Sequence, residues 1–91
     1  MNLNVNTHWA MNTCPASGPQ KLVLLLLAYL ADEDGQCSPT FEDFEFMTSM
    51  SVRTVRKALV ALVEQRYIED TGKRIGLGGS TKVWQLMRAK K

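Results

Sequence analysis

The sequence predicts a small α+β domain that is mainly α-helical and ends in a short β-hairpin, and three observations support this. Ten consecutive apolar residues, Leu22 to Ala31, and a strongly amphipathic segment, Val52 to Gln65, both have the length of a helix. Two short segments rich in β-branched and aromatic residues then flank a glycine-rich stretch, which is typical of a hairpin. The 91 residues allow one hydrophobic core, so we expect a single domain over residues 1–91.

The N-terminal segment is rich in asparagine, and Leu3 and Val5 alternate with these polar residues. A period of two favours a β-strand, but the segment is short. We therefore expect residues 1–8 to form either an edge strand or a frayed N-terminal arm.

The first helix is expected from Pro19 to Ala31, with Ser17 as its N-cap and Pro19 in its first turn. Its apolar run is about half the roughly 20 residues that cross a bilayer, which predicts a core helix and no membrane span. Both sides of this helix are apolar. The side that carries Leu24, Leu27 and Ala31 must be covered, either by the N-terminal segment with Trp9 or by another subunit.

A short second helix is expected from Phe41 to about Met47, after a few extended residues from Gln36 to Ser38. Thr40 precedes Asp43 by three residues, a weaker relative of the Ser/Thr-x-x-Glu capping box. The core of this helix is predicted to be Phe44 and Met47.

The third helix is expected from Val52 to Gln65, after a tight connection over residues 48–50 and with Ser51 as its N-cap. One stripe is apolar and the opposite face is polar, with Arg56 at the margin. The stripe comprises Val52, Val55, Leu59, Leu62 and Val63, and the polar face Arg53, Thr54, Lys57, Ala61 and Glu64.

The C-terminal part is predicted to be a hairpin with strands at Tyr67 to Glu69 and Lys82 to Leu86. Between them, residues 71–81 have the glycines and the length of a flexible connection. The aromatic side chains of Tyr67 and Trp84 are expected in the core. Residues 87–91 are expected to form a basic tail.

Helix, short strand, helix, turn, helix and hairpin is the order of a winged helix-turn-helix domain, with three helices and a two- or three-stranded wing. Residues Ser51 to Ile68 read SVRTVRKALVALVEQRYI and resemble a signature of bacterial and phage winged helix-turn-helix proteins. Upstream, Lys21 to Ala28, Asp32 to Gly35 and Ser38 to Thr40 resemble landmarks of the helix-turn-helix domain of phage and plasmid replication proteins and small regulators. The resemblance extends from about Trp9 to Leu86.

The chain departs from that family pattern in two places. The second helix is acidic, with Glu42, Asp43 and Glu45, so it is not expected to anchor phosphates. Arg66 replaces the glycine that follows the third helix in the family. A non-glycine residue in the left-handed conformation costs on the order of 1 kcal/mol, which an Arg66 contact to phosphate would offset.

Charge is strongly divided along the chain, although the overall net charge is only +2. Residues 1–50 hold one basic and six acidic residues, and residues 51–91 hold ten basic and three acidic residues, which gives net charges of −5 and +7. The basic half is suited to an anionic partner, and nucleic acid is the first candidate. A basic surface without any partner is the alternative.

These observations predict a DNA interface with two parts. Arg53, Thr54 and Lys57 are assigned to base edges in the major groove, because the first turns of a recognition helix reach them. Arg56 is assigned to phosphate, and the helix N-terminus near Ser51 adds partial positive charge. The wing, with Lys73, Arg74 and the glycines after them, is the candidate for the second part, for contact with the backbone or the minor groove. The alternative is a hairpin that is rich in glycine only because it must turn. The predicted DNA-binding residues are Ser51, Arg53, Thr54, Arg56, Lys57, Arg66, Lys73, Arg74 and Lys82.

Other functions are not indicated by the sequence. Cys14 and Cys37, with the single His8, form neither a C-x-x-C pair nor a zinc quartet, so we expect free thiols in a reducing cytosol and no metal or cofactor. The N-terminus lacks the features of a signal peptide, which predicts a cytoplasmic protein. No catalytic constellation is present, which argues against an enzyme.

The predicted function is therefore sequence-specific binding of double-stranded DNA, as a transcriptional regulator or as the DNA-recognition module of a phage or plasmid replication or excision assembly. A module this small reads few base pairs, so a homodimer or a protein partner is expected. The candidate interfaces are the side of the first helix with Leu24, Leu27 and Ala31, and the segment from Leu3 to Val5. The alternative is a winged-helix module that binds protein through its acidic half and does not read DNA.

Overall fold

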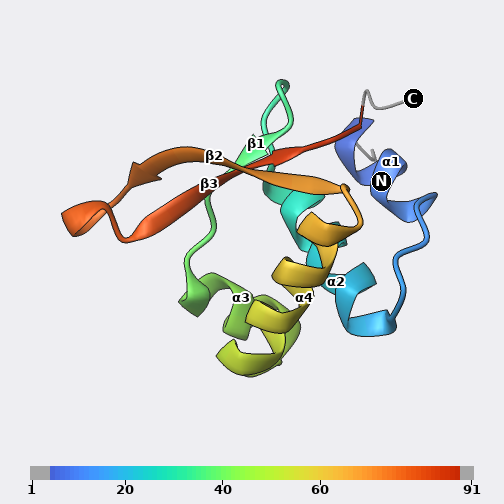
Figure 1. The fold of residues 1–91 in the computed structure, drawn as a ribbon, viewed down its shortest axis with the longest axis horizontal. Coiled ribbons are helices and arrows are strands. Elements are labelled where there is room, and N and C mark those ends of the chain that lie inside the picture. The colour runs from blue at the N-terminus through green and yellow to red at the C-terminus, as the bar shows by residue number, and fades with distance from the viewer. Residues whose placement is uncertain (1–4, 89–91) are drawn as a thin grey trace.

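A computed structural model describes residues 5–88 and consists of a helical layer beneath a small antiparallel sheet, from which one hairpin projects (Figure 1). The helices surround α2, and the hairpin extends well beyond them. The elements are α1 Val5–Met11, α2 Gly18–Leu30, β1 Gln36–Cys37, α3 Phe41–Thr48, α4 Val52–Glu64, β2 Ile68–Ile75, the 3-10 turn η1 Leu77–Gly79, and β3 Thr81–Leu86. The predicted α+β architecture, three helices followed by a wing, is confirmed, and α1 is an additional helix.

The sheet has the strand order β1-β3-β2, with both pairs antiparallel. Cys37 of β1 pairs with Trp84 of β3, and Ile68 at the start of β2 pairs with Leu86 at the end of β3. The short β1 therefore joins the base of the hairpin to the helical layer. The predicted extended residues before α3 are this strand.

The core lies between α2, α4 and the base of the sheet. Helix α2 is central because apolar side chains on several of its sides are covered, which matches the unbroken apolar run in its sequence. The predicted core position of Trp84 is confirmed, and Tyr67 packs partly buried against the same cluster. The largest fully buried side chains are Val23, Leu24, Leu27, Phe44, Val55, Leu62 and Ile68.

The N-terminal prediction is wrong for the residues that can be compared, because Val5 to Met11 form a helix and not an edge strand or an arm. The buried side chain of Asn6 donates a 2.9 Å hydrogen bond to the carbonyl of Asp32, just past the end of α2. Lys21 donates from its Nζ to the carbonyls of Ala10 and Met11, at 2.8 and 2.7 Å. These bonds satisfy exposed carbonyls at two helix ends, an interaction between distant segments that local periodicity does not reveal. Leu3 lies outside the described residues.

The apolar side of α2 with Leu24 and Leu27 is covered within the chain, where both side chains are fully buried. Helix α1 packs against α2, so the first of the two coverings left open by the sequence is the observed one. The proposed interface at Leu24, Leu27 and Ala31 is therefore wrong. The solvent-facing side of α2 is instead the one with Leu22, Tyr29 and Leu30.

Helix α3 begins with the predicted capping box. The Asp43 amide donates to Thr40 Oγ1 at 3.0 Å, and the Thr40 amide donates to the Asp43 carboxylate at 2.9 Å. Phe44 is buried as predicted, but Met47 is 42% exposed, so its predicted burial is wrong. Thr48 takes the inward position, where its hydroxyl donates to the carbonyl of Phe44 at 2.6 Å.

The hairpin differs from the predicted flexible loop, because β2 continues to Ile75 and only residues 76–80 form the turn. A bulge interrupts the register between Asp70 and Arg74, where three residues of β2 lie opposite Val83 alone. Gly78 and Gly79 both have a φ of +68° at the tip, a conformation that glycine adopts without strain. The basic residues of the hairpin consequently lie on its stem, with Lys73 in the bulge, and not at its tip.

None of the helices within residues 5–88 has both the length and the apolar character that crossing a membrane requires.

Candidate DNA interface

Helices α3 and α4 form a compact pair joined by three residues. Ser49, after the last residue of α3, has a left-handed φ of 60°, and its amide donates to the carbonyl of Glu45 at 2.9 Å. Thr48 Oγ1 accepts a 3.1 Å hydrogen bond from the Met50 amide. The predicted tight connection is thus held by its own hydrogen bonds, which fix the angle at which α4 begins.

The N-terminus of α4 is open and basic. Ser51 caps it as predicted, since its Oγ accepts a 3.2 Å hydrogen bond from the Thr54 amide. Arg53, Arg56 and Lys57 are exposed on the first two turns. The remaining unpaired amides and the helix dipole add partial positive charge at the same end. An anion that approaches this end of α4 meets side-chain cations and backbone donors together.

Thr54 lies less outward than the sequence suggests. It is half-buried, and its Oγ1 accepts a 3.1 Å hydrogen bond from the Ser51 hydroxyl. The centre of the exposed face is formed by Arg53, Lys57 and Val60. Thr54 therefore borders the exposed basic surface, and Arg53 and Lys57 carry it.

The hairpin brings together Lys73, Arg74 and Lys82, which are all exposed. Arg74 is engaged by Asp70, with its two terminal nitrogens 3.0 and 3.1 Å from the two carboxylate oxygens. The Gly72 amide and then the Arg74 guanidinium hold the pKa of Asp70 below its usual value. Arg74 is the single basic residue among residues 5–88 that pairs with a carboxylate, so Lys73 and Lys82 carry the unpaired charge of the hairpin stem.

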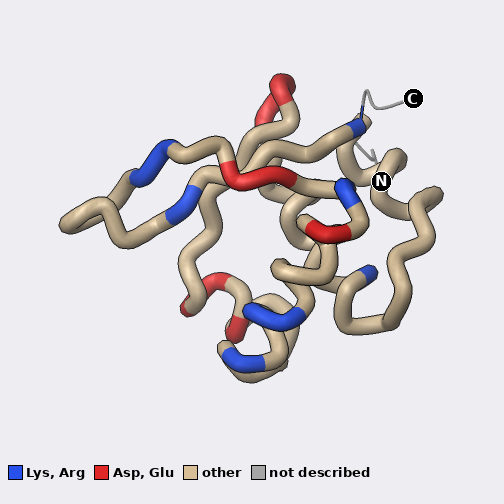
Figure 2. Tube along the Cα trace, viewed as in Figure 1, with Lys and Arg blue, Asp and Glu red and all other residues tan. Residues whose placement is uncertain are grey.

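Charge segregates in space as well as along the chain (Figure 2). Basic positions lie mainly on the hairpin and the start of α4, whereas acidic positions lie on α3 and on the turn between α2 and β1, with three more at the end of α4 and the start of β2, Glu64, Glu69 and Asp70. The three acidic side chains of α3, Glu42, Asp43 and Glu45, are exposed. The expectation that α3 does not anchor phosphates stays a prediction that fits this arrangement.

Arg66 lies apart from the other predicted DNA-binding residues. It follows the C-terminal end of α4, which at 1.5 Å per residue is about 20 Å from Arg53 along the helix axis. Its φ of 66° is left-handed, as its place in the family pattern implied. The Arg66 and Tyr67 amides donate to the carbonyls of Val63 and Leu62, both at 3.0 Å, which completes a Schellman motif.

Arg66→Gly is expected to raise the free energy of unfolding by about 1 kcal/mol, because glycine adopts the left-handed conformation without a Cβ clash. Urea denaturation of the two proteins measures the difference. Arg66→Ala is the matched control, since it removes the same charge and retains the strain. Equal stability of the glycine and alanine variants would show that backbone strain at residue 66 is negligible.

Two further sequence expectations concern residues outside the interface. Arg88, predicted in the basic tail, donates to Asn6 Oδ1 and, at 2.8 Å, to the carbonyl of Glu33, so it joins both ends of the chain to the α2–β1 turn. Lys90 and Lys91 lie outside the described residues.

Cys14 is exposed and Cys37 is buried, and both thiols are free. Burial, with a smaller effect of Asp32, raises the pKa of Cys37 to about 12. Within residues 5–88, no cluster of three or more His, Cys, Asp or Glu side chains is placed to hold a metal ion.

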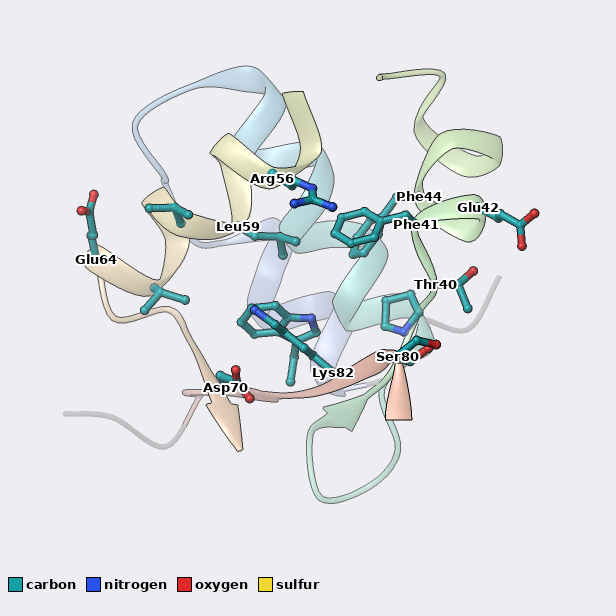
Figure 3. A pocket seen from close by; sticks show the side chains of 15 residues that line it. Thr40, Phe41, Glu42, Phe44, Arg56, Leu59, Glu64, Asp70, Ser80 and Lys82 are labelled. Carbon is teal, nitrogen blue, oxygen red and sulfur yellow. The ribbon is translucent and has the colours of Figure 1, made fainter. Parts of the chain in front are cut away.

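A groove of about 860 Å³ beside α4 was missed by the sequence interpretation (Figure 3). It lies between the start of α3, one side of α4 and the base of the hairpin. Val63, a member of the apolar stripe of α4, lines this groove and is 40% exposed. Val60 was the available signal, because it is an apolar residue on the polar side of an amphipathic helix.

The fold and its exposed elements define a winged helix-turn-helix domain: α3 and α4 are the two helices, α4 presents a basic N-terminus, and β2 and β3 form the wing. Comparison with known families gives the same result, with a match to a helix-turn-helix domain family over residues 17–68. This match covers more than half of the chain, which therefore belongs to that family. Neither the curated proteins nor the solved structures contain a match to this chain. DNA is the partner that helix-turn-helix membership suggests.

Proposed function

We propose that this protein binds double-stranded DNA in a sequence-specific manner, with α4 in the major groove and the β2–β3 hairpin as a basic wing. The observation that carries the proposal is the open N-terminus of α4, where Arg53, Arg56 and Lys57 are exposed and have no carboxylate partner within residues 5–88. A helix of this kind fits the major groove, and its first turns reach base edges.

The wing supports the same assignment. Lys82 pairs with Arg74 across the hairpin, and the Lys73 amide in the bulge donates to Thr71 Oγ1 at 3.2 Å, so both backbone positions are held before binding. The tip of the hairpin has Leu77 and glycines and no charge, whereas the charges are on the stem. This arrangement is suited to contact with phosphates along the backbone by the stem, while α4 occupies the groove.

A single winged helix-turn-helix domain supports the role of a recognition module. One such module buries about 600–1,000 Å² of protein surface on DNA, which is too little for genomic specificity. We propose that it acts together with a second copy of itself or with a protein partner. Its role is that of a cytoplasmic transcriptional regulator or of a component of a replication or excision assembly of a phage or plasmid.

Fluorescence anisotropy with labelled duplex DNA over a series of salt concentrations tests the proposal. If about five phosphates are neutralised, the logarithm of the association constant is expected to fall with the logarithm of salt concentration with a slope of about −4.5. Six cations that have no carboxylate partner within residues 5–88 make this number attainable: Arg53, Arg56, Lys57, Arg66, Lys73 and Lys82. An absence of salt-dependent binding at high protein concentration would contradict DNA binding.

A protein-binding module is the second candidate, and the surface of α3 favours it. Glu42, Asp43 and Glu45 are exposed there together with Phe46, which is 88% exposed. An acidic helix with a bare aromatic side chain suits a basic, partly apolar protein surface. This candidate is distinguished from the first by the same anisotropy experiment, since it predicts no DNA binding.

A further inference from the structure

The groove beside α4 has the dimensions and the composition of a ligand site. Its volume of about 860 Å³ lies within the roughly 300–1,000 Å³ of small-molecule pockets. Its floor is formed by the buried side chains of Phe44, Leu59 and Trp84. Like most ligand sites, the groove is therefore a mainly apolar concavity on a preformed scaffold.

The walls of the groove leave apolar surface in water. Val60 is 58% exposed, and Val63 and Phe41 on either side of the floor are 40% and 37% exposed. Val60 lies on the side of α4 that is otherwise charged, so the helix gains nothing from this side chain in the free protein. Burial of this surface would be favourable for any occupant that matches it.

Two cations border the groove, one over an aromatic ring of its wall and one over an aromatic ring of its floor (Figure 3). The guanidinium carbon of Arg56 lies 4.8 Å from the centre of the Phe41 ring, and Lys82 Nζ lies 5.6 Å from the centre of the Trp84 ring. Neither cation pairs with a carboxylate of residues 5–88. A stacked guanidinium still has its N–H edge available, so Arg56 can bind a carboxylate or sulfonate through two donors.

The acidic residues that line the groove do not neutralise this pair. The side chains of Glu42 and Glu64 lie at opposite sides of the view and point away from Arg56 and Lys82. Asp70 lies near Lys82 but is hydrogen-bonded to Arg74 by both of its oxygens. The centre of the groove is therefore apolar and bordered by unpaired positive charge.

We propose that this groove binds a small aromatic anion, an aromatic carboxylate or sulfonate, and that the bound anion competes with DNA. The ring system occupies the apolar surface between Phe41 and Val63, and the anionic group binds Arg56 and Lys82. Because both cations are also proposed to contact DNA phosphate, occupation of the groove removes them from the DNA interface. This competition rests on the proposed function, whereas the binding site itself does not.

The aromatic sulfonate 8-anilinonaphthalene-1-sulfonate serves as the probe, and its fluorescence is titrated with the full chain. Its uncharged counterpart N-phenyl-1-naphthylamine is titrated in parallel to isolate the contribution of the charge. The sulfonate is expected to bind the wild-type protein at one site and more tightly than the amine. Equal affinity for the two probes would contradict the role of Arg56 and Lys82.

Val60→Asp places a carboxylate in the groove and is expected to weaken sulfonate binding about tenfold or more. Phe46→Ser is the matched control, since Phe46 is exposed on α3 outside the groove, and its variant is expected to bind the probe like the wild type. Thermal unfolding of both variants verifies that they remain folded, and Lys82→Gln provides a second variant that removes only a charge. If Val60→Asp and Phe46→Ser weaken the probe equally, the probe binds elsewhere and the proposal fails.

Light scattering after size exclusion addresses the other occupant, a second copy of the chain. A wild-type dimer that becomes a monomer in Val60→Asp would show that the groove is a protein interface and would overturn the proposal.

Competition is measured by anisotropy, where the apparent dissociation constant for DNA is expected to rise about tenfold at a sulfonate concentration about nine times its own dissociation constant. Simultaneous binding of DNA and sulfonate would refute the competition and leave the site intact. A protein that binds the sulfonate but no DNA would refute only the proposed function.

Discussion

Leu24→Ala is expected to lower the free energy of unfolding by about 2–5 kcal/mol, because the removed side chain is fully buried and leaves a cavity in the core. Native domains are stable by only about 5–15 kcal/mol, so the loss is a large part of the total. Urea denaturation monitored by Trp fluorescence gives the change, with Trp84 in the core as one of the reporters. The mass in solution is expected to remain that of the wild type.

Leu22→Ala is the control for this prediction. Leu22 is in the same helix, two residues earlier, but is 39% exposed. Its truncation is expected to cost much less than that of Leu24, since less apolar surface returns to water. If Leu24→Ala left stability unchanged and dissociated a dimer, α2 would form a subunit interface and the packing of α1 on it would be wrong.

Local sequence signals predicted most of the fold because each has a local cause. Ser17, Thr40 and Ser51 cap their helices as expected, since a side-chain oxygen within three residues of the unpaired amides satisfies them. The amphipathic stripe located α4 to within one residue at its end. Capping and periodicity depend only on residues that are close along the chain, so both can be recognised in a single sequence.

The errors arose where distant segments decide the structure. Helix α1 depends on Asn6, which reaches the end of α2, and on Lys21, whose ammonium group binds the last carbonyls of α1. The extended β2 depends on its pairing with β3, which includes a bulge. The alternation of polar and apolar residues within residues 1–8 gives no information about these contacts. Tertiary interactions override such weak local preferences.

The sequence predicted which residue types form the candidate site, but it predicted the geometry of the site only in part. The charge division placed the bases on α4 and the hairpin, where the structure has them exposed. It did not reveal that Asp70 engages Arg74, because the bulge that brings them together is a property of strand register. The groove was missed for a similar reason, since its walls come from α3, α4 and β3.

Because α4 is proposed to contact bases and the wing to contact phosphates, substitutions in these two elements are expected to change DNA binding in different ways. Arg53→Ala is expected to reduce discrimination between the preferred DNA sequence and a sequence changed at one base pair by about 1–3 kcal/mol, because a bidentate contact to guanine is lost. Lys73→Ala is expected to weaken binding to both sequences by the same factor and to reduce the salt slope by about one unit, because it removes a phosphate contact.

The measurement begins with selection of a preferred duplex from a random pool, followed by anisotropy of wild type and both variants on the preferred and changed sequences. Both side chains are exposed and free of carboxylate partners within residues 5–88, so neither change is expected to disturb the fold. The two variants differ in the element that carries the lost charge, and each serves as the control for the other. Base contacts specify sequence and phosphate contacts fix position. Arg53→Ala is therefore expected to reduce sequence discrimination, and Lys73→Ala to reduce affinity for both sequences. An equal loss of affinity on both duplexes for both variants would place Arg53 on the DNA backbone and contradict insertion of this face of α4 into the major groove.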